Sequence, residues 1–197
     1  MPLKKIVIIG PESTGKSTLC EGLAAHFHTD WVPEYAREYL LTHGMNYQYE
    51  DLLTIARGQL ALEDAKAAAL SAGNSVVGRP AAGPSADGPR IVGQSILFVD
   101  TDLYVMKVWS EFVYGRCHPW ILGQIASRKY DGYLLCRTDL PWVKDELREY
   151  PDLVTREKLF HIYRDLLVNQ PTPWTEIGGM ADDRLASAIE AVKELIA

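Results

Sequence analysis

The sequence predicts an α/β fold in which helices cover both faces of a parallel β-sheet. Two observations support this prediction. Short runs of β-branched and aliphatic residues recur along the chain, for example at residues 5–9 and 96–99. Longer segments with an apolar residue at every third or fourth position separate these runs. Strands that alternate with helices pair in parallel through right-handed crossovers, so we expect one sheet with helices on each side.

We expect five strands, each a short apolar run that a sheet can bury on both faces. They are residues 5–9, 31–32, 96–99, 133–136 and 174–177. Helices are predicted between and after them from apolar periodicity, with Gly44 ending the second and Asp182 capping the last. Their predicted ranges are 15–28, 34–43, 51–71, 103–114, 119–129, 155–169 and from 182 onward.

Residues 1–197 are expected to form a single domain, because the run after position 95 completes the same sheet. Residues 72–95 differ in being rich in Gly, Pro, Ser and Ala, and we expect a flexible surface insertion there. A lid or a partner-binding loop is the alternative to an insertion that is merely tolerated.

Composition and charge are those of an ordinary globular protein, with 47% apolar and 23% charged residues. The net charge of −6 disfavours nucleic acid as a partner, because binding a phosphate backbone requires a basic face. No run approaches the roughly 20 apolar residues of a membrane helix, so we expect a cytoplasmic protein without membrane contact. The three cysteines are widely spaced and are expected to be reduced, and no protein partner is evident.

The motif GPESTGKST at residues 10–18 matches the phosphate-binding loop pattern G-x-x-x-x-G-K-[ST]. It follows an apolar strand and opens an amphipathic helix, which is the context that this motif requires. In such a loop, backbone N–H groups surround phosphate oxygens, Lys16 reaches the β- and γ-phosphates, and the Ser17 hydroxyl ligates Mg²⁺. We therefore expect ATP and Mg²⁺ here, and the residues expected to bind the nucleotide are Gly10, Glu12, Ser13, Thr14, Gly15, Lys16, Ser17 and Thr18.

The run ILFVDTD at residues 96–102 supplies a carboxylate at the end of a predicted strand. Beside a phosphate loop, Asp100 is suited to hold Mg²⁺ directly or through water. Asp102 is equally suited to cap the helix that begins at position 103.

Two further segments carry charged residues toward the same edge of the predicted sheet. Glu34 and Arg37 are three positions apart on a predicted helix, so they share a face and are suited to bind a hydroxyl compound, with a surface ion pair as the alternative. Residues 138–157 carry Arg148 and Arg156 amid alternating charges. This segment is suited to a lid whose arginines stabilise the transferred phosphoryl group, with a solvated helical hairpin as the alternative.

Six motifs, taken together, resemble the ribosylnicotinamide kinase domain of the NadR-type NAD-salvage proteins. In chain order they are GPESTGKSTL, PEYARE, FVDTD, CHPW, DLPWVKDELR and EIGG…DR, and they span the chain except for residues 72–95. The resemblance implies a P-loop NTPase fold like that of the nucleoside monophosphate kinases, with strand order 2-3-1-4-5 and a lid. It also implies ATP-dependent phosphorylation of the 5′-hydroxyl of nicotinamide riboside to give nicotinamide mononucleotide.

The resemblance implies roles for individual residues as well. Glu34, Tyr35 and Arg37 would line the riboside side, and Asp100 and Asp102 would serve Mg²⁺ or the attacking hydroxyl. Arg148 would be a lid arginine. The catalytic residues would thus be Lys16, Asp100, Glu34 and Arg148, and the choice of base between the two acids stays open.

Two positions depart from the family pattern. In the family an aromatic residue that stacks on the pyridine ring precedes the glutamate of the PEYAR-like motif, and here that position is Pro33. A second stacking aromatic is expected in the following long helix, where this chain has Ala65. Trp31 would lie on the same side as Pro33 in an extended segment and would then replace the first. The alternatives to a nicotinamide riboside kinase are a kinase for another nucleoside or monophosphate and a nucleotide-binding regulatory ATPase.

Overall fold

The computed structural model describes residues 2–72 and 95–196, so the expected insertion lies outside the described residues except for its two end positions. The strands are β1 (Lys4–Ile9), β2 (Asp30–Val32), β3 (Ile96–Asp100), β4 (Gly132–Cys136) and β5 (Trp174–Ile177). The helices are α1 (Lys16–His26), α2 (Tyr35–His43), α3 (Tyr49–Ser71), α4 (Leu103–Tyr114), α5 (Pro119–Ser127), α6 (Leu153–Val168) and α7 (Ala181–Ile196). All five predicted strands and all seven predicted helices are confirmed, with ends that shift by a few residues.

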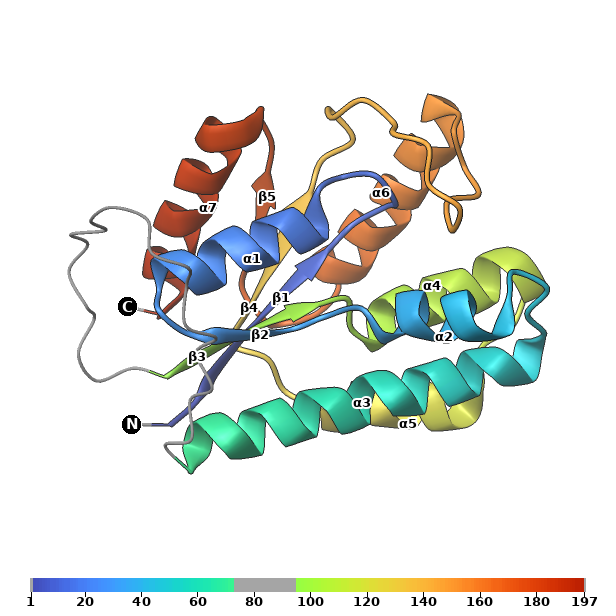
Figure 1. Cartoon of the computed structure of the whole chain (residues 1–197), viewed down its shortest axis with the longest axis horizontal. Coiled ribbons are helices and arrows are strands. Elements are labelled where there is room, and N and C mark those ends of the chain that lie inside the picture. The colour runs from blue at the N-terminus through green and yellow to red at the C-terminus, as the bar shows by residue number, and fades with distance from the viewer. Residues whose placement is uncertain (1, 73–94, 197) are drawn as a thin grey trace.

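The five strands form one parallel sheet in the order β2-β3-β1-β4-β5, as predicted. β1 lies at its centre, where Ile8 pairs with Asp100 of β3 on one side and with Leu134 of β4 on the other. Because the strands run in parallel, the loops after β1, β2, β3 and β4 leave the sheet at one edge. That edge brings the phosphate loop and the predicted acidic residues together (Figure 1).

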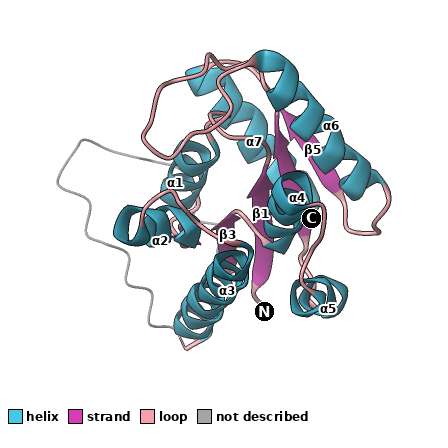
Figure 2. Cartoon of the chain, turned by 90° about the vertical axis from the view of Figure 1, so that its right-hand side faces the viewer, coloured by secondary structure: helices cyan, strands magenta, loops and turns pink. Residues whose placement is uncertain are grey.

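Helices cover both faces of the sheet, as Figure 2 shows. Alternate residues of β1 point to opposite faces. Ile6 and Ile8 pack in a core with residues of α1 and α7, whereas Val7 and Ile9 pack in a second core with residues of α4 and α6. A third cluster joins residues of α2, α3, α4 and α5 and includes Tyr35 and Ala36 at the start of α2.

Side chains at the helix ends explain most of the differences from the predicted bounds. Asp152 accepts a hydrogen bond from Thr155 N–H and starts α6 two residues earlier than the periodicity indicated. Gln48 and Asp51 form a capping box that starts α3 at Tyr49. Asp182 lies within the first turn of α7 and is not its cap, so that prediction was wrong.

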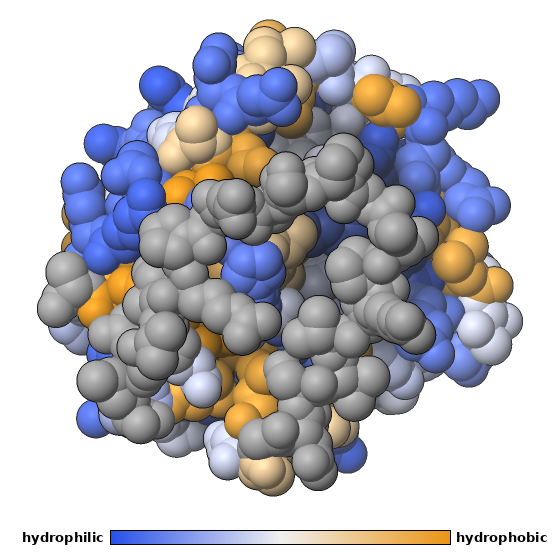
Figure 3. All heavy atoms as spheres, turned by 60° about the vertical axis from the view of Figure 1, so that its left-hand side comes forward, coloured by the Kyte–Doolittle hydropathy of each residue, from blue (hydrophilic) through white to orange (hydrophobic). Residues whose placement is uncertain are grey.

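The surface of the described residues carries many hydrophilic side chains, as the composition of an ordinary globular protein predicts. Hydrophilic side chains occupy much of the outer rim of the face drawn in Figure 3. Across residues 2–72 and 95–196, no helix combines the length and the apolar character that crossing a membrane requires. The three cysteines carry free thiols, as expected.

Candidate active site

The phosphate loop connects β1 to α1 with the conformation that its glycines permit. Gly10 has φ 147°, and a Cβ atom there would lie 2.8 Å from the carbonyl oxygen of Cys136. Gly15 has φ 76° and stands directly before the first turn of α1. The Lys16 ammonium donates to the carbonyl of Pro11 at 2.9 Å, so it lies across the loop. The loop therefore presents a cation and a helix N-terminus to the same space.

Two buried arginines hold this loop from behind. Arg156 of α6 donates to the carbonyls of Ser13 and Leu140, at 3.1 and 3.2 Å. Arg184 of α7 donates to the carbonyl of Thr14 at 3.0 Å. Both side chains are almost fully buried, so their charges support the loop and do not face the cavity. The expectation that Arg156 acts from a lid was therefore wrong.

Asp100 ends β3 beside the first turn of α1. Its Oδ2 atom accepts a 2.5 Å hydrogen bond from the Ser17 hydroxyl, and its side chain is fully buried. Burial raises the pKa of Asp100 to about 6, and the charge of Glu34 adds to this rise, while Lys16 and the Ser17 hydroxyl oppose it. A hydroxyl and a carboxyl group thus stand together next to the lysine of the loop.

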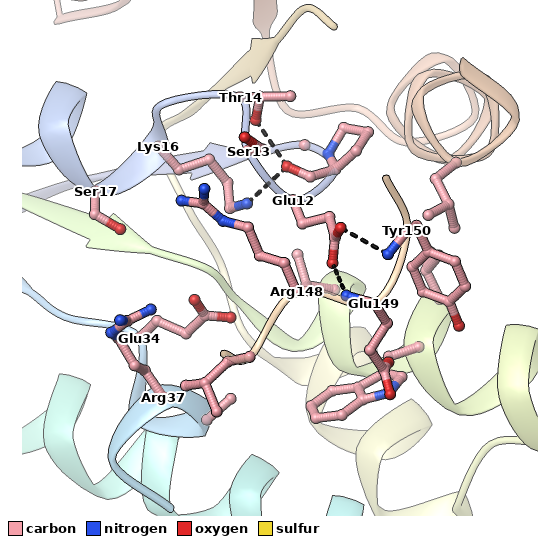
Figure 4. A pocket seen from close by; sticks show the side chains of 18 of the residues that line it. Glu12, Ser13, Thr14, Lys16, Ser17, Glu34, Arg37, Arg148, Glu149 and Tyr150 are labelled. Carbon is pink, nitrogen blue, oxygen red and sulfur yellow. Dashed lines mark hydrogen bonds between the residues drawn. The ribbon is translucent and has the colours of Figure 1, made fainter. Parts of the chain in front are cut away.

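A cavity of about 240 Å³ opens in front of the loop and continues between α2, α4 and α6. All of the predicted nucleotide-binding residues line it, as do Glu34, Arg37 and Arg148. Figure 4 shows Glu34 extending into the cavity on the side of Ser17, while Arg148 extends toward Lys16. The side of the cavity away from the loop is largely apolar and includes Leu40, Met45, Val105, Val108, Trp109, Phe112, Leu159 and Tyr163.

Of the two neighbouring residues predicted to bind the acceptor at the start of α2, one faces the cavity and the other does not. Glu34 is the N-cap residue of α2 and faces the cavity. Tyr35 turns away, because its ring packs against Gly58 of α3 and its backbone N–H donates to Gln59 at 2.7 Å. Tyr35 therefore positions α2 and lies outside the cavity lining.

Asp102 also lies outside this cavity, although it was expected on the substrate side. Its carboxylate caps α4 by accepting from Tyr104 N–H at 2.9 Å, and it accepts from the Tyr133 hydroxyl at 2.9 Å. Burial raises its pKa to about 7, and these two hydrogen bonds oppose the rise. The capping alternative therefore describes this residue.

The residues between β4 and α6, numbers 137–152, form a segment without helix that lies over the phosphate loop, and we call it the lid segment. Glu12 of the loop accepts hydrogen bonds from Trp142 Nε1 and from the backbone N–H groups of Glu149 and Tyr150. Arg37 of α2 forms a bidentate pair with Asp145, at 2.9 and 3.2 Å. The lid segment is thus tied to both ends of the cavity, and the alternative of a helical hairpin is wrong.

The tryptophan expected to replace the missing stacking residue lies elsewhere. Trp31 packs against the core beneath α1, on the opposite face of the sheet from α4 and α6. Pro33 and Ala65 are exposed and are absent from the cavity lining. Trp109 of α4 lines the cavity instead. The sequence offered it only as one of several aromatic residues suited either to stack on a ring or to fill the core, and its spacing did not separate the two roles.

Comparisons with known proteins identify chains that are related to this one. A family model described as an AAA domain matches residues 5–77 and 90–184. The chain is 28% identical over 199 residues to the trifunctional NAD biosynthesis/regulator protein NadR of Salmonella typhimurium, a match that covers 98% of this chain and 43% of that protein. The chain therefore spans less than half the length of this relative.

Two solved structures have the same fold. The crystal structure of NadR protein in complex with NR superposes with a TM-score of 0.71 at 22% identity, over 98% of this chain and 50% of that one. Thymidylate kinase from Ehrlichia chaffeensis superposes with a TM-score of 0.59 at 12% identity over the full length of both chains. The predicted likeness to nucleoside monophosphate kinases is thereby confirmed at the level of the fold.

Proposed function

We propose that this chain, which belongs to the AAA domain family, is a kinase that transfers the γ-phosphoryl group of ATP to the 5′-hydroxyl of nicotinamide riboside. The product is nicotinamide mononucleotide. The observation that carries the proposal is one continuous cavity that joins a formed phosphate loop to a wall bearing Glu34 and Arg37. A relative that is named for NAD biosynthesis and a neighbour that holds NR support nicotinamide riboside as the acceptor.

The loop end of the cavity binds the triphosphate of ATP. Its backbone N–H groups surround the phosphates, and Lys16 leaves the Pro11 carbonyl to contact the γ-phosphate. Arg148 extends into the same space from the lid segment (Figure 4). Two cations therefore stabilise the charge that develops on the transferred group.

Ser17 and Asp100 fit the Mg²⁺ that accompanies ATP. They offer a hydroxyl and a carboxylate 2.5 Å apart, and Mg²⁺ favours such oxygen ligands in small numbers completed by substrate phosphates. When bound, Mg²⁺ would neutralise part of the negative charge of the ATP phosphates.

Glu34 is the better candidate for the acid that orients the acceptor hydroxyl and takes its proton. It lines the cavity, whereas Asp100 is fully buried and engaged by Ser17. A base must come within hydrogen-bond reach of the reacting hydroxyl, and this criterion favours Glu34.

The proposal is tested by following ADP release from the purified protein with ATP, Mg²⁺ and a panel of nucleosides and nucleoside monophosphates. We expect nicotinamide riboside to raise turnover above the water background more than the other acceptors. Lys16→Ala should abolish this turnover, while Lys193→Ala, which changes an exposed lysine of α7, should retain it. Turnover that no acceptor stimulates would favour the regulatory ATPase, and stimulation by another acceptor alone would reassign the substrate.

A further inference from the structure

The apolar side of the cavity contains one aromatic ring that is held rigidly. Trp109 donates its indole N–H to the Tyr47 hydroxyl at 2.9 Å, and the two rings meet edge to face with centroids 4.9 Å apart. Trp109 is partly exposed and lines the cavity. An indole fixed in this way offers an apolar surface to a ligand ring at little entropic cost.

A carboxylate lies next to this indole. The Tyr47 hydroxyl that accepts from Trp109 donates in turn to Glu149, with distances of 3.0 and 3.2 Å to its two carboxylate oxygens. Glu149 also lines the cavity. Figure 4 shows its side chain extending away from Lys16, in the direction opposite to that of Arg148. The chain Trp109–Tyr47–Glu149 therefore places a ring and an acid side by side, away from the phosphate end.

Within residues 2–72 and 95–196, Glu149 forms no ion pair. The backbone N–H of Glu149 donates to Glu12, and its carboxylate accepts from Tyr47, so the residue is held at both its backbone and its carboxylate. A carboxylate without a cationic partner on the wall of a cavity, linked through Tyr47 to an indole that lines the same cavity, is a complementary environment for a positively charged aromatic ring.

We propose that Trp109 and Glu149 form the ring subsite of this cavity and select acceptors whose ring carries a positive charge. This inference rests on the proposed function and deepens it, because the nicotinamide ring of the riboside is a pyridinium cation. It also accounts for the exposed Pro33 and Ala65, since α4 and the lid segment supply the ring contacts that α2 and α3 do not.

The test compares two acceptors that differ in ring charge, namely nicotinamide riboside and its neutral dihydro form. Glu149→Gln keeps an oxygen that accepts from Tyr47 and removes the charge. We expect the ratio of kcat/KM for the charged acceptor to that for the neutral one to fall about tenfold, mainly through KM. Glu157→Gln, an exposed change on α6, should leave the ratio unchanged. Trp109→Leu should lower kcat/KM for both acceptors.

A binding measurement separates this inference from the proposed function. The dissociation constants of 1-methylnicotinamide, a cation, and of nicotinamide, which is neutral, are measured by ligand-observed NMR without ATP. We expect the wild type to prefer the cation and Glu149→Gln to lose that preference. Equal affinities in the wild type, or a preference that survives in Glu149→Gln, would overturn the ring subsite. A ring preference without phosphoryl transfer to either riboside would overturn the proposed function alone.

Discussion

Glu12 accepts a 2.8 Å hydrogen bond from the backbone N–H of Tyr150, which joins the phosphate loop to the lid segment across 138 positions of sequence. The same carboxylate accepts from Glu149 N–H at 2.9 Å and from Trp142 Nε1 at 3.0 Å. Arg148 directly precedes the two backbone donors. The loop that binds phosphate thereby determines where the lid arginine lies.

Glu12→Gln should weaken this connection, because an amide has one accepting oxygen where the carboxylate has two. At least one of the three hydrogen bonds is lost and Arg148 becomes less well placed. We expect kcat to fall about tenfold and amide hydrogen exchange in residues 141–150 to accelerate. Glu157→Gln is the matched control. Unchanged exchange in this segment would show that Glu12 does not hold it.

Much of the site could be predicted because its residues belong to local patterns. The phosphate loop is a contiguous motif after a strand, and Asp100 ends a buried run, so spacing alone placed both at one edge of the sheet. Arg148 and Arg156 lie eight positions apart in one charged segment, so their spacing does not distinguish them. Only the packing of α6 shows that Arg148 lines the cavity and that Arg156 is buried.

The remaining features depend on contacts between distant segments. Nothing local distinguishes Glu12 as an acceptor for the lid segment, and Trp109 has the spacing of a core residue. Asp102 caps α4 through the nearby Tyr104 N–H, but its second partner, the Tyr133 hydroxyl, is 31 positions away and could not be found from local spacing. Such contacts follow from tertiary packing, which hydrophobic periodicity does not encode.

Arg184→Leu should destabilise the fold strongly. The guanidinium is almost fully buried and donates to the carbonyls of Thr14 and Arg137, which would lose these partners. We expect the free energy of unfolding in urea to fall by about 3–5 kcal/mol. Arg164→Leu removes a half-exposed arginine paired with Glu176 and should cost no more than about 1 kcal/mol. Equal losses in the two variants would contradict the structural role of Arg184.

Gly58→Ala should disturb the start of α2 from a distance. A Cβ atom at this position would lie 2.1 Å from the ring of Tyr35, so the ring must move and carry the neighbouring Glu34 with it. We expect a loss of about 1–3 kcal/mol in unfolding free energy despite the better helix propensity of alanine. Gly123→Ala in α5 meets no atom within 4 Å and should be neutral or stabilising. If both changes raise the free energy of unfolding, the Tyr35 ring can move aside without destabilising the fold.

The preference for a charged ring should depend on pH through Glu149. Burial raises the pKa of this carboxyl above its ordinary value, the Tyr47 hydrogen bond opposes the rise, and the charge of Glu12 adds to it. Glu149 therefore takes up its proton at a higher pH than a glutamate with its ordinary pKa does. The ratio of kcat/KM for the charged to the neutral riboside should be highest at neutral pH and should fall as the pH drops into the acid range, beginning at a higher pH than an unperturbed glutamate would give. The same pH profile in Glu149→Gln would assign the effect to another group.

The proposed function requires that the phosphoryl group pass to a riboside and not to water. Phosphorus-31 NMR of a reaction with ATP, Mg²⁺ and nicotinamide riboside measures this directly. We predict a new phosphomonoester resonance, coupled to the 5′-methylene protons of the riboside, that grows in equal amount with ADP. ADP accompanied only by inorganic phosphate, at a rate that the riboside does not change, would contradict the account.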